Sequence, residues 1–119
     1  MKAPTGCRLW NKPELLLKWY TDCLFEVVET FVEESHWRRA LLKCRECGQL
    51  YFYEFHEEID WVGGNDPQYR TYIPVETAEE ITTLKETSTL ELLAFGPRLQ
   101  KDWPSDAEKP RAYWVGKKE

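Results

Sequence analysis

Residues 43–60 read KCRECGQLYFYEFHEEID, and this stretch decides the fold. Two cysteines stand two residues apart, a glycine follows the second, and a run rich in aromatic side chains comes next. Cys-x-x-Cys-Gly is typical of a zinc knuckle, a hairpin tip in which the glycine takes a positive φ. Both faces of the following run are apolar near its start, which indicates a strand buried on both sides. We therefore predict a hairpin at 44–48 that leads into a long central strand over 49–60.

Shorter elements are predicted on both sides of this hairpin. Thr77 with Glu80 and Ser88 with Glu91 form capping-box patterns, which open helices, and Gly96-Pro97 is a stop signal. Runs of β-branched and aromatic residues favour strands. Strands are predicted at 24–33, 36–43, 69–75 and 111–115, helices at 12–21, 78–86 and 90–95, and loops at 61–68 and 98–110.

These elements predict a single α+β domain over residues 1–119. Its expected architecture is a mostly antiparallel sheet of four to five strands, with a zinc-knuckle-like hairpin and two or three short helices. A chain of 119 residues is long enough to bury a hydrophobic core without disulfides.

The charge distribution argues against nucleic acid as a direct partner. The formal net charge is −5, and between Glu54 and Asp66 there are five acidic residues and no lysine or arginine. Affinity for phosphate comes mainly from basic side chains, so a nucleic-acid-binding protein shows the opposite bias. An acidic face instead suits a basic protein partner, or it is simply a solvated surface.

The first residues lack the apolar region of a signal peptide, and no stretch of the chain approaches the length needed to span a bilayer. We therefore expect a cytoplasmic protein without a membrane partner. In that compartment thiols stay reduced, and a close cysteine pair more often indicates metal binding or redox chemistry than a structural disulfide.

The four cysteines are candidate zinc ligands. Structural zinc prefers four tetrahedral ligands, usually supplied as two close pairs. Here Cys44 and Cys47 form one pair, and Cys7 and Cys23 can complete the set only if the N-terminal segment folds back over the hairpin. The alternatives are free thiols without a metal, a disulfide and a redox pair.

The stretch from Glu54 to Tyr69 is the candidate partner-binding surface. Trp and Tyr dominate binding hot spots, and carboxylates steer a basic partner toward its site. The predicted contact residues are Glu54, Glu57, Glu58, Asp60, Trp61, Asp66 and Tyr69. The alternative is that Trp61 and Tyr69 pack on the sheet and that the glycine-containing loop between them is only a tight turn.

The sequence contains no clear catalytic motif, and we do not expect an enzyme. His56-Glu57-Glu58 is similar to part of a metalloprotease motif, but the second histidine is missing and the segment has a strand pattern. A metal-dependent hydrolase would need His56 and Glu58 to converge with other carboxylates in a deep pocket.

Residues 44–75 resemble a group of small bacterial proteins. The shared features are CRECGQLYFYEF, then IDWVGGNDPQY and YIPV, in which a Cys-x-x-Cys-Gly knuckle leads into an aromatic strand and an acidic loop. Some proteins of this kind resemble immunity proteins, which neutralise a cognate toxin by binding it. The resemblance implies a small acidic protein-binding domain that inhibits a basic toxin or nuclease by covering its surface. The alternative is a zinc-ribbon-like structural or regulatory adaptor.

Overall fold

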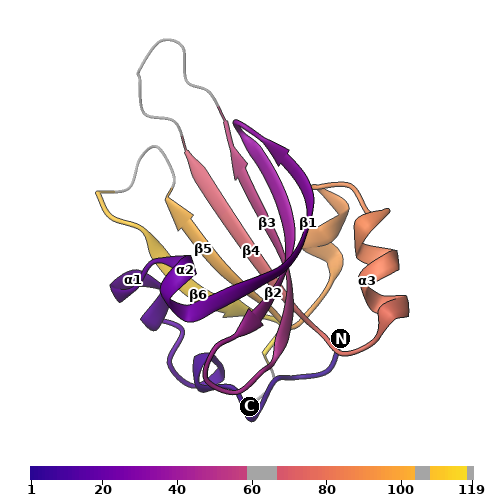
Figure 1. Cartoon of the computed structure of the whole chain (residues 1–119). Helices are drawn as coiled ribbons and strands as arrows, with labels where there is room; N and C mark the ends of the chain where they lie inside the picture. Colours follow the sequence, from indigo (N-terminus) through magenta and orange to yellow (C-terminus); the bar gives the residue numbers. More distant parts are fainter. Residues whose placement is uncertain (59–66, 104–107, 118–119) are drawn as a thin grey trace.

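A computed structural model describes residues 1–58, 67–103 and 108–117, and it shows an α+β fold with a six-stranded antiparallel sheet (Figure 1). No helix in these residues is long and apolar enough to cross a membrane. The elements along the chain are η1 (Arg8–Trp10), α1 (Leu15–Lys18), α2 (Thr21–Leu24), β1 (Phe25–Glu34), β2 (Trp37–Cys44), β3 (Leu50–Glu57), β4 (Gln68–Val75), α3 (Ala78–Lys85), η2 (Glu91–Ala94), β5 (Arg98–Trp103) and β6 (Arg111–Val115).

The sheet is a meander in which every strand pairs with its neighbours in the chain, in the order β1-β2-β3-β4-β5-β6. The hairpin between β2 and β3 is formed as predicted. Gly48 has a φ of 81°, and its N–H donates to the Cys44 carbonyl oxygen at 2.9 Å. The predicted strand over 49–60 is the third of six, so it lies in the middle of the sheet.

The predicted count of four to five strands was too low, because residues 98–103 form β5 and not a loop. The predicted helix over 12–21 is also divided. Trp19 and Tyr20 have extended backbones that end α1 and precede α2. This break lets the N-terminal segment reach both edge strands, since α1 contacts β6 and α2 contacts β1. The helix predicted at 90–95 is the short 3₁₀ turn η2.

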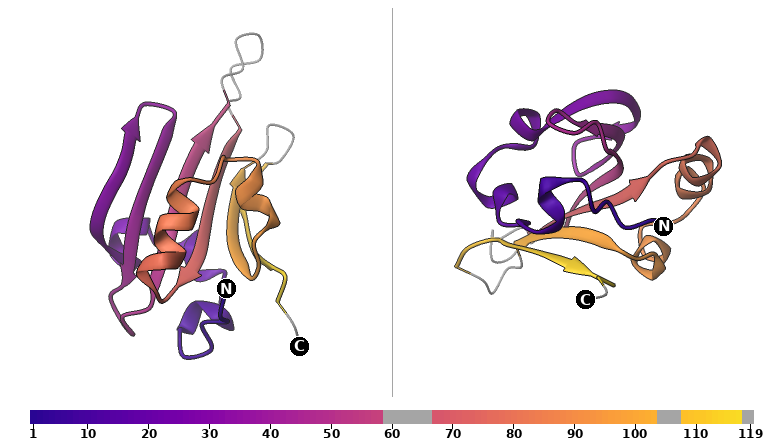
Figure 2. Two further views of the ribbon diagram at one scale, coloured as in Figure 1. Left: turned by 90° about the vertical axis from the view of Figure 1, so that its right-hand side faces the viewer. Right: turned by 90° about the horizontal axis from the view of Figure 1, so that it is seen from below.

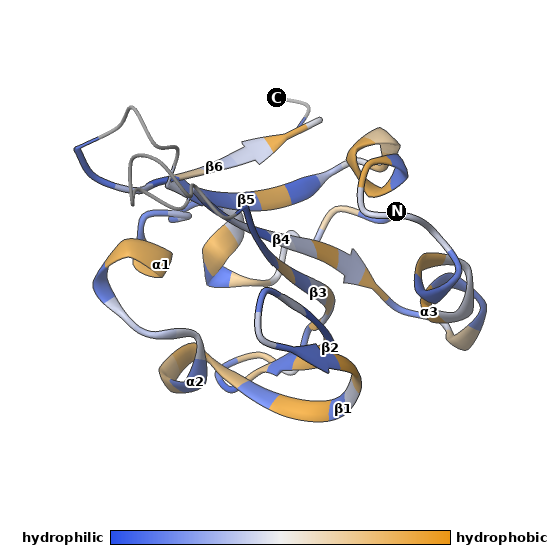
Figure 3. Ribbon diagram, turned by 90° about the horizontal axis from the view of Figure 1, so that it is seen from above, coloured by the Kyte–Doolittle hydropathy of each residue, from blue (hydrophilic) through white to orange (hydrophobic). Residues whose placement is uncertain are grey.

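One side of the sheet, here called the closed face, is covered by the N-terminal segment. Its core includes Phe25 and the tyrosines 51, 53 and 72 from the strands. Leu9 and Leu16 of the N-terminal segment pack on these side chains and are almost fully buried. Figure 3 shows α1 and α2 on the opposite side of the sheet from α3.

The other side, here called the open face, is covered over only part of its area. Leu41, Phe52 and Ile73 form an apolar row across β2, β3 and β4, and Leu84 of α3 and Leu92 of η2 pack on this row. Figure 2 shows α3 and η2 in front of the strands on this side. A capping box between Thr77 and Glu80 fixes the start of α3, as predicted.

Next to the apolar row, the open face is polar. The strand register places Arg39, Glu54, Thr71, Gln100 and Tyr113 side by side from β2 to β6. The following row on the same face runs through Trp37, His56, Tyr69, Asp102 and Arg111. The open face therefore changes from apolar to polar along the strands. α3 and η2 cover the apolar half of this face and end at the border of the polar half.

Candidate functional site

Three of the four cysteines come together where the N-terminal segment crosses the β2–β3 hairpin. Cys44 ends β2, Cys47 lies in the hairpin turn and Cys7 precedes η1. Their three sulfur atoms all lie within 4.8 Å of one another. Thiolates at this spacing are suitable ligands for a soft or borderline divalent cation, so the cluster could hold a metal ion.

Burial of the cluster favours neutral thiols over bare thiolates. Cys7 and Cys44 are buried, Cys47 is exposed, and none of them is in a disulfide. Burial raises the pKa of Cys7 to about 12. The hydroxyl of Tyr51 is buried beside these thiols without a well-formed hydrogen bond in the described part of the chain. A hydroxyl in this position can donate to a thiolate, which is the kind of outer-shell support that metal ligands receive.

Cys23 does not belong to the three-cysteine cluster. It is exposed, and it lines a separate cavity of about 480 Å³ together with Cys44 and Arg8. The prediction of a four-cysteine set is therefore reduced to three, because α2 places Cys23 on the surface ahead of β1. Neither histidine is part of the cluster, since His36 bonds Glu57 and His56 lines the open-face cavity.

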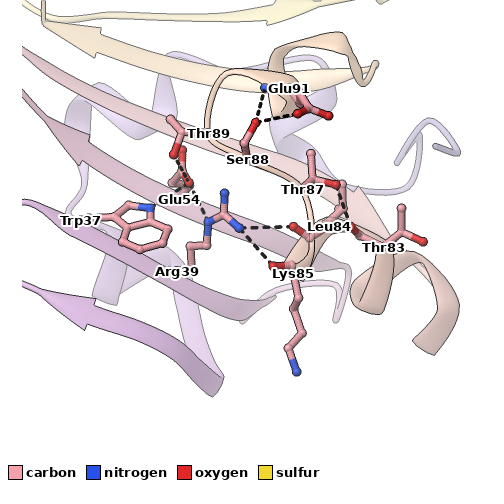
Figure 4. A network of polar contacts seen from close by, with 10 residues as sticks. All are labelled: Trp37, Arg39, Glu54, Thr83, Leu84, Lys85, Thr87, Ser88, Thr89 and Glu91. Carbon is pink, nitrogen blue, oxygen red and sulfur yellow. Dashed lines mark hydrogen bonds and ion pairs between the residues drawn. The ribbon is translucent and has the colours of Figure 1, made fainter.

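Glu54 lies at the centre of a buried hydrogen-bond network on the open face (Figure 4). Its Oε2 accepts from Arg39 Nε at 2.7 Å, Trp37 Nε1 at 3.0 Å and Thr89 Oγ1 at 3.1 Å. Nη1 of Arg39 also donates to the Leu84 carbonyl oxygen at 3.4 Å. The network joins β2 and β3 to the segment that follows α3.

Glu54, one of the predicted contact residues, is not on the open surface of the protein. Only 3% of the residue is exposed, and its carboxylate forms an ion pair with Arg39, which is almost as deeply buried. A buried carboxylate needs such a partner, because leaving an ion uncompensated away from water costs several kcal/mol. The sequence pattern could not reveal the pair, since strand alternation gives the face of Glu54 but not what covers it.

Three of the predicted contact residues nevertheless line one cavity. Glu54, Glu58 and Tyr69 surround a hollow of about 530 Å³ on the polar half of the open face. Glu58 is exposed and Tyr69 is half-buried. His56 lies between them and stacks on Tyr69, with 6.3 Å between ring centroids.

The other predicted contact residues are placed differently or not described. Glu57 lies on the opposite side of β3 from Glu58, where it accepts from Gln68 Nε2 at 2.9 Å and bonds His36 Nδ1 at 2.7 Å. The hydrogen bond with His36 holds the pKa of Glu57 below its ordinary value. Asp60, Trp61 and Asp66 lie outside the described residues.

The floor of the cavity contains polar residues that sequence reasoning missed. Thr71, Gln100 and Asp102 line it and are almost fully buried. Gln100 Nε2 donates to Asp102 Oδ1 at 3.2 Å, and the Tyr113 hydroxyl donates to Asp102 Oδ2. Burial and this hydrogen bond raise the pKa of Tyr113 to about 12, so its hydroxyl stays protonated at neutral pH. The available signal was the alternation of polar residues in 98–103, which we interpreted as a loop.

The rim of the cavity is apolar on the side of η2. Leu90 and Leu93 line the hollow and are 78% and 46% exposed. Arg98 also lines it, but Nη1 is held by the carbonyl oxygens of Leu93 and Phe95 at 2.7 and 3.1 Å. The hollow therefore combines exposed apolar side chains on its rim with carboxylates in its lining.

Among the described residues, the three cysteines are the only group of His, Cys, Asp or Glu side chains close enough together to hold a metal ion. His56 and Glu58 share the open-face cavity, but they are not part of such a group. Comparison of the chain with protein-family models, with curated proteins and with solved structures finds no match.

Proposed function

We propose that this protein is a binding domain of the immunity type, which inhibits a basic protein partner by covering its surface. The observation that carries the proposal is the cavity on the open face, where Leu90 and Leu93 border Glu58 and Asp102. Apolar side chains supply contact area that is removed from water, and the carboxylates favour a positively charged partner.

The chemistry of the cavity supports a basic partner over an acidic one. Three carboxylates line it, those of Glu54, Glu58 and Asp102, against the single arginine Arg98. Arg39 compensates the charge of Glu54, which leaves two carboxylates against one guanidinium. Phosphate groups would meet like charge here, so direct nucleic-acid binding is disfavoured. A toxin or nuclease that itself binds nucleic acid has the complementary basic surface.

Site-specific crosslinking followed by quantitative binding tests the proposal. A photoreactive benzoylphenylalanine in place of Leu90 should capture the partner from a lysate of the source cell, whereas the same group in place of Thr83 on α3 should not. The captured protein is then purified. Glu58→Lys should weaken its binding and the inhibition of its activity by about tenfold or more, as expected for a charge reversal at an interface.

The matched control is Glu29→Lys, which makes the same charge change on the exposed part of β1. It should leave binding within about twofold, since charges outside the interface act only through weak, screened fields. Equal capture at positions 90 and 83, or equal effects of the two charge reversals, would contradict the assignment of this face.

A second proposal concerns the cysteine cluster, which we assign to structural zinc. The three sulfur donors match the zinc-binding preference for thiolates, and the Tyr51 hydroxyl supplies a buried donor beside them. Bound zinc would supply a crosslink between the N-terminal segment and the β2–β3 hairpin. This supports the zinc-ribbon-like alternative as a structural feature that stabilises the closed face.

Metal analysis of the full chain, purified without chelators, tests the zinc proposal. We expect close to one zinc per chain, and less than about a tenth of a zinc per chain would contradict it. Cys7→Ser and Cys44→Ser should each abolish tight binding. Cys23→Ser distinguishes a three-cysteine ligand set from a four-cysteine set. It should leave the zinc content unchanged if the three clustered cysteines suffice. It should weaken zinc binding if Cys23 moves in as a fourth ligand.

A further inference from the structure

The floor of the open-face cavity holds two neighbouring oxygen atoms, Glu54 Oε1 and Thr71 Oγ1, that lack a hydrogen-bond partner among the described residues. Neither is one of the buried side-chain atoms without a partner, so both are open to the hollow. Glu54 and Thr71 are direct cross-strand partners, and they are 3% and 6% exposed. The three donors to Glu54 all reach Oε2, and no described residue donates to Oε1. The Thr71 hydroxyl has no hydrogen bond with a described side chain or backbone group, although the residue lines the hollow.

Polar atoms that face a hollow can be hydrogen-bonded by water or by a ligand that enters it. Side chains of directly opposed residues on one sheet face have Cβ atoms about 5 Å apart. Glu54 and Thr71 therefore offer two adjacent acceptors to a single group that enters the cavity. Such a group must be a hydrogen-bond donor.

The charges around the cavity favour a cationic donor. Arg39 forms an ion pair with Glu54 and so compensates its charge, and Arg98 is bound to backbone carbonyl oxygens at the rim. Asp102 receives hydrogen bonds from the neutral groups of Gln100 and Tyr113. The lining therefore keeps a negative excess, to which the exposed Glu58 also contributes.

Aromatic rings form part of the cavity wall and suit a flat cation. Tyr69 is stacked on His56, and Tyr113 borders the hollow on the side of β6. The guanidinium of Arg111 already lies over the Tyr113 ring, 6.0 Å from its centroid, so the partner's cation would take the other face of this ring. The face of an aromatic ring attracts a cation, more often a guanidinium than an ammonium. A guanidinium also carries five N–H donors in one plane, so it can meet several acceptors at once.

We infer that this cavity binds the guanidinium group of an arginine side chain presented by the protein partner. The inference rests on the proposed function, because it names the group that the open face recognises. Glu54 Oε1 and the Thr71 hydroxyl accept hydrogen bonds from the guanidinium, Asp102 and Glu58 supply charge, and the tyrosine rings flank its plane. Leu90 and Leu93 contact the residues of the partner around the arginine.

The probe for the test is N-acetyl-arginine-N-methylamide, which presents one arginine side chain without a free terminus. Titrated into the ¹⁵N-labelled full chain, it should shift the amide resonances of Thr71, Gln100 and Asp102. A compound of this size should bind with a Kd on the order of 1 mM. The citrulline analogue has almost the same shape without the charge, and it should bind at least about tenfold more weakly.

The lysine analogue and two variants complete the test. The lysine analogue should bind more weakly than the arginine analogue, since an ammonium has fewer donors and no plane to stack. Thr71→Val should weaken arginine binding by about fivefold through the loss of one hydrogen bond, whereas Thr83→Val on α3 should not change it. Thermal melting shows whether each variant is folded, and the analogue comparison needs no variant.

The outcomes separate this inference from the proposed function. Equal affinity for the arginine and citrulline analogues, or tighter binding of the lysine analogue, overturns the arginine assignment, as does the absence of shifts at the cavity. Suppose that at the same time the photoreactive group at position 90 still captures a partner and Glu58→Lys still weakens the binding of that partner. The open face is then an interface that does not recognise arginine. If both fail, the open face is not the working surface.

Discussion

The closed face and the open face of the sheet bury different kinds of side chain. On the closed face, the tyrosines 51, 53 and 72 and Phe25 are buried under the N-terminal segment and contact one another as rings. On the open face, the buried polar residues lie beside a hollow, and the cover provided by α3 and η2 stops short of it.

The difference indicates which face contributes most to stability, and it is consistent with the proposed role of the open face in binding. Removing apolar area from water contributes about 25 cal/mol per Å². A buried hydrogen bond contributes only about 0.5–1.5 kcal/mol net, and a buried polar group without a partner costs about 1–3 kcal/mol. A row of buried polar residues is therefore costly as a scaffold. Its presence on one face only is expected where a surface is used for recognition.

The largest loss of stability is expected when a buried aromatic ring on the closed face is replaced by a small side chain. Phe25→Ala removes a ring that is 1% exposed and that packs on Tyr51 and Tyr72 with centroid distances of 5.5 and 5.4 Å. We expect a loss of about 4 kcal/mol in the free energy of unfolding, measured by chemical denaturation. Val28→Ala on the exposed part of β1 is the control and should cost less than about 1 kcal/mol.

A smaller but still large effect is expected from the polar network of the open face. Glu54→Gln keeps the size of the side chain but leaves the Arg39 charge buried without a counter-ion. We expect a loss of about 3 kcal/mol in the free energy of unfolding. If the loss were below about 0.5 kcal/mol, the pair would be solvated in solution and the two faces would not differ as described.

The double variant Arg39→Met/Glu54→Leu sharpens this result. When both charges are replaced by apolar side chains of similar size, the desolvation cost disappears together with the attraction. We therefore expect the double variant to be more stable than Glu54→Gln, by at least about 1 kcal/mol. A double variant that is less stable than Glu54→Gln would mean that the network itself holds the segment after α3 in place.

The features that depend on neighbouring residues were the more predictable ones from sequence, whichever face of the sheet they belong to. The aromatic run in β3, the Cys-x-x-Cys-Gly hairpin and the capping box of α3 each depend on residues that are close together in the chain. Their local chemistry specifies φ, capping or strand alternation without help from distant parts. The hairpin, the central position of β3 and the start of α3 were predicted correctly for this reason.

The polar half of the open face was less predictable because its strands carry polar residues at buried positions. In β5, Arg98, Gln100 and Asp102 share one face, and this polar alternation was taken for a loop. The Arg39–Glu54 pair joins residues whose contact follows only from the strand register. Binary patterning fails at buried polar positions, which are common at functional sites, so the missed strand and the candidate site coincide.

A modest effect is expected from the helix that covers the open face. The Thr77 hydroxyl accepts from the Glu80 N–H at 3.1 Å, and the Glu80 carboxylate accepts from the Thr77 N–H at the same distance. Thr77→Ala should reduce the free energy of unfolding by about 1 kcal/mol. Hydrogen exchange should accelerate in α3 and leave the amides of Tyr51 and Tyr72 protected. Equal acceleration on both faces would show that they unfold as one unit.

The smallest effect concerns Glu57, which lies on the opposite side of β3 from the cavity residue Glu58. Its hydrogen bond with His36 lowers its pKa in the folded state, so the ionised form is favoured by folding. This stabilisation is present above the pKa of the unfolded chain and is lost as the pH falls through the folded-state pKa. His36→Ala should therefore raise the pKa of Glu57 toward its ordinary value, as measured by carboxyl ¹³C NMR.

The same variant should also lower stability slightly at neutral pH, by a few tenths of a kcal/mol, because the pair lies near the surface. The difference from the unmodified chain should vanish below the folded-state pKa of Glu57, where the carboxyl group is protonated in both proteins. Binding at the cavity should be unchanged, since Glu57 points away from it. If His36→Ala altered both the Glu57 titration and the affinity of the cavity for arginine, the two sides of β3 would be coupled at this end of the sheet. The proposed division between a stabilising face and a binding face would then not hold at this end.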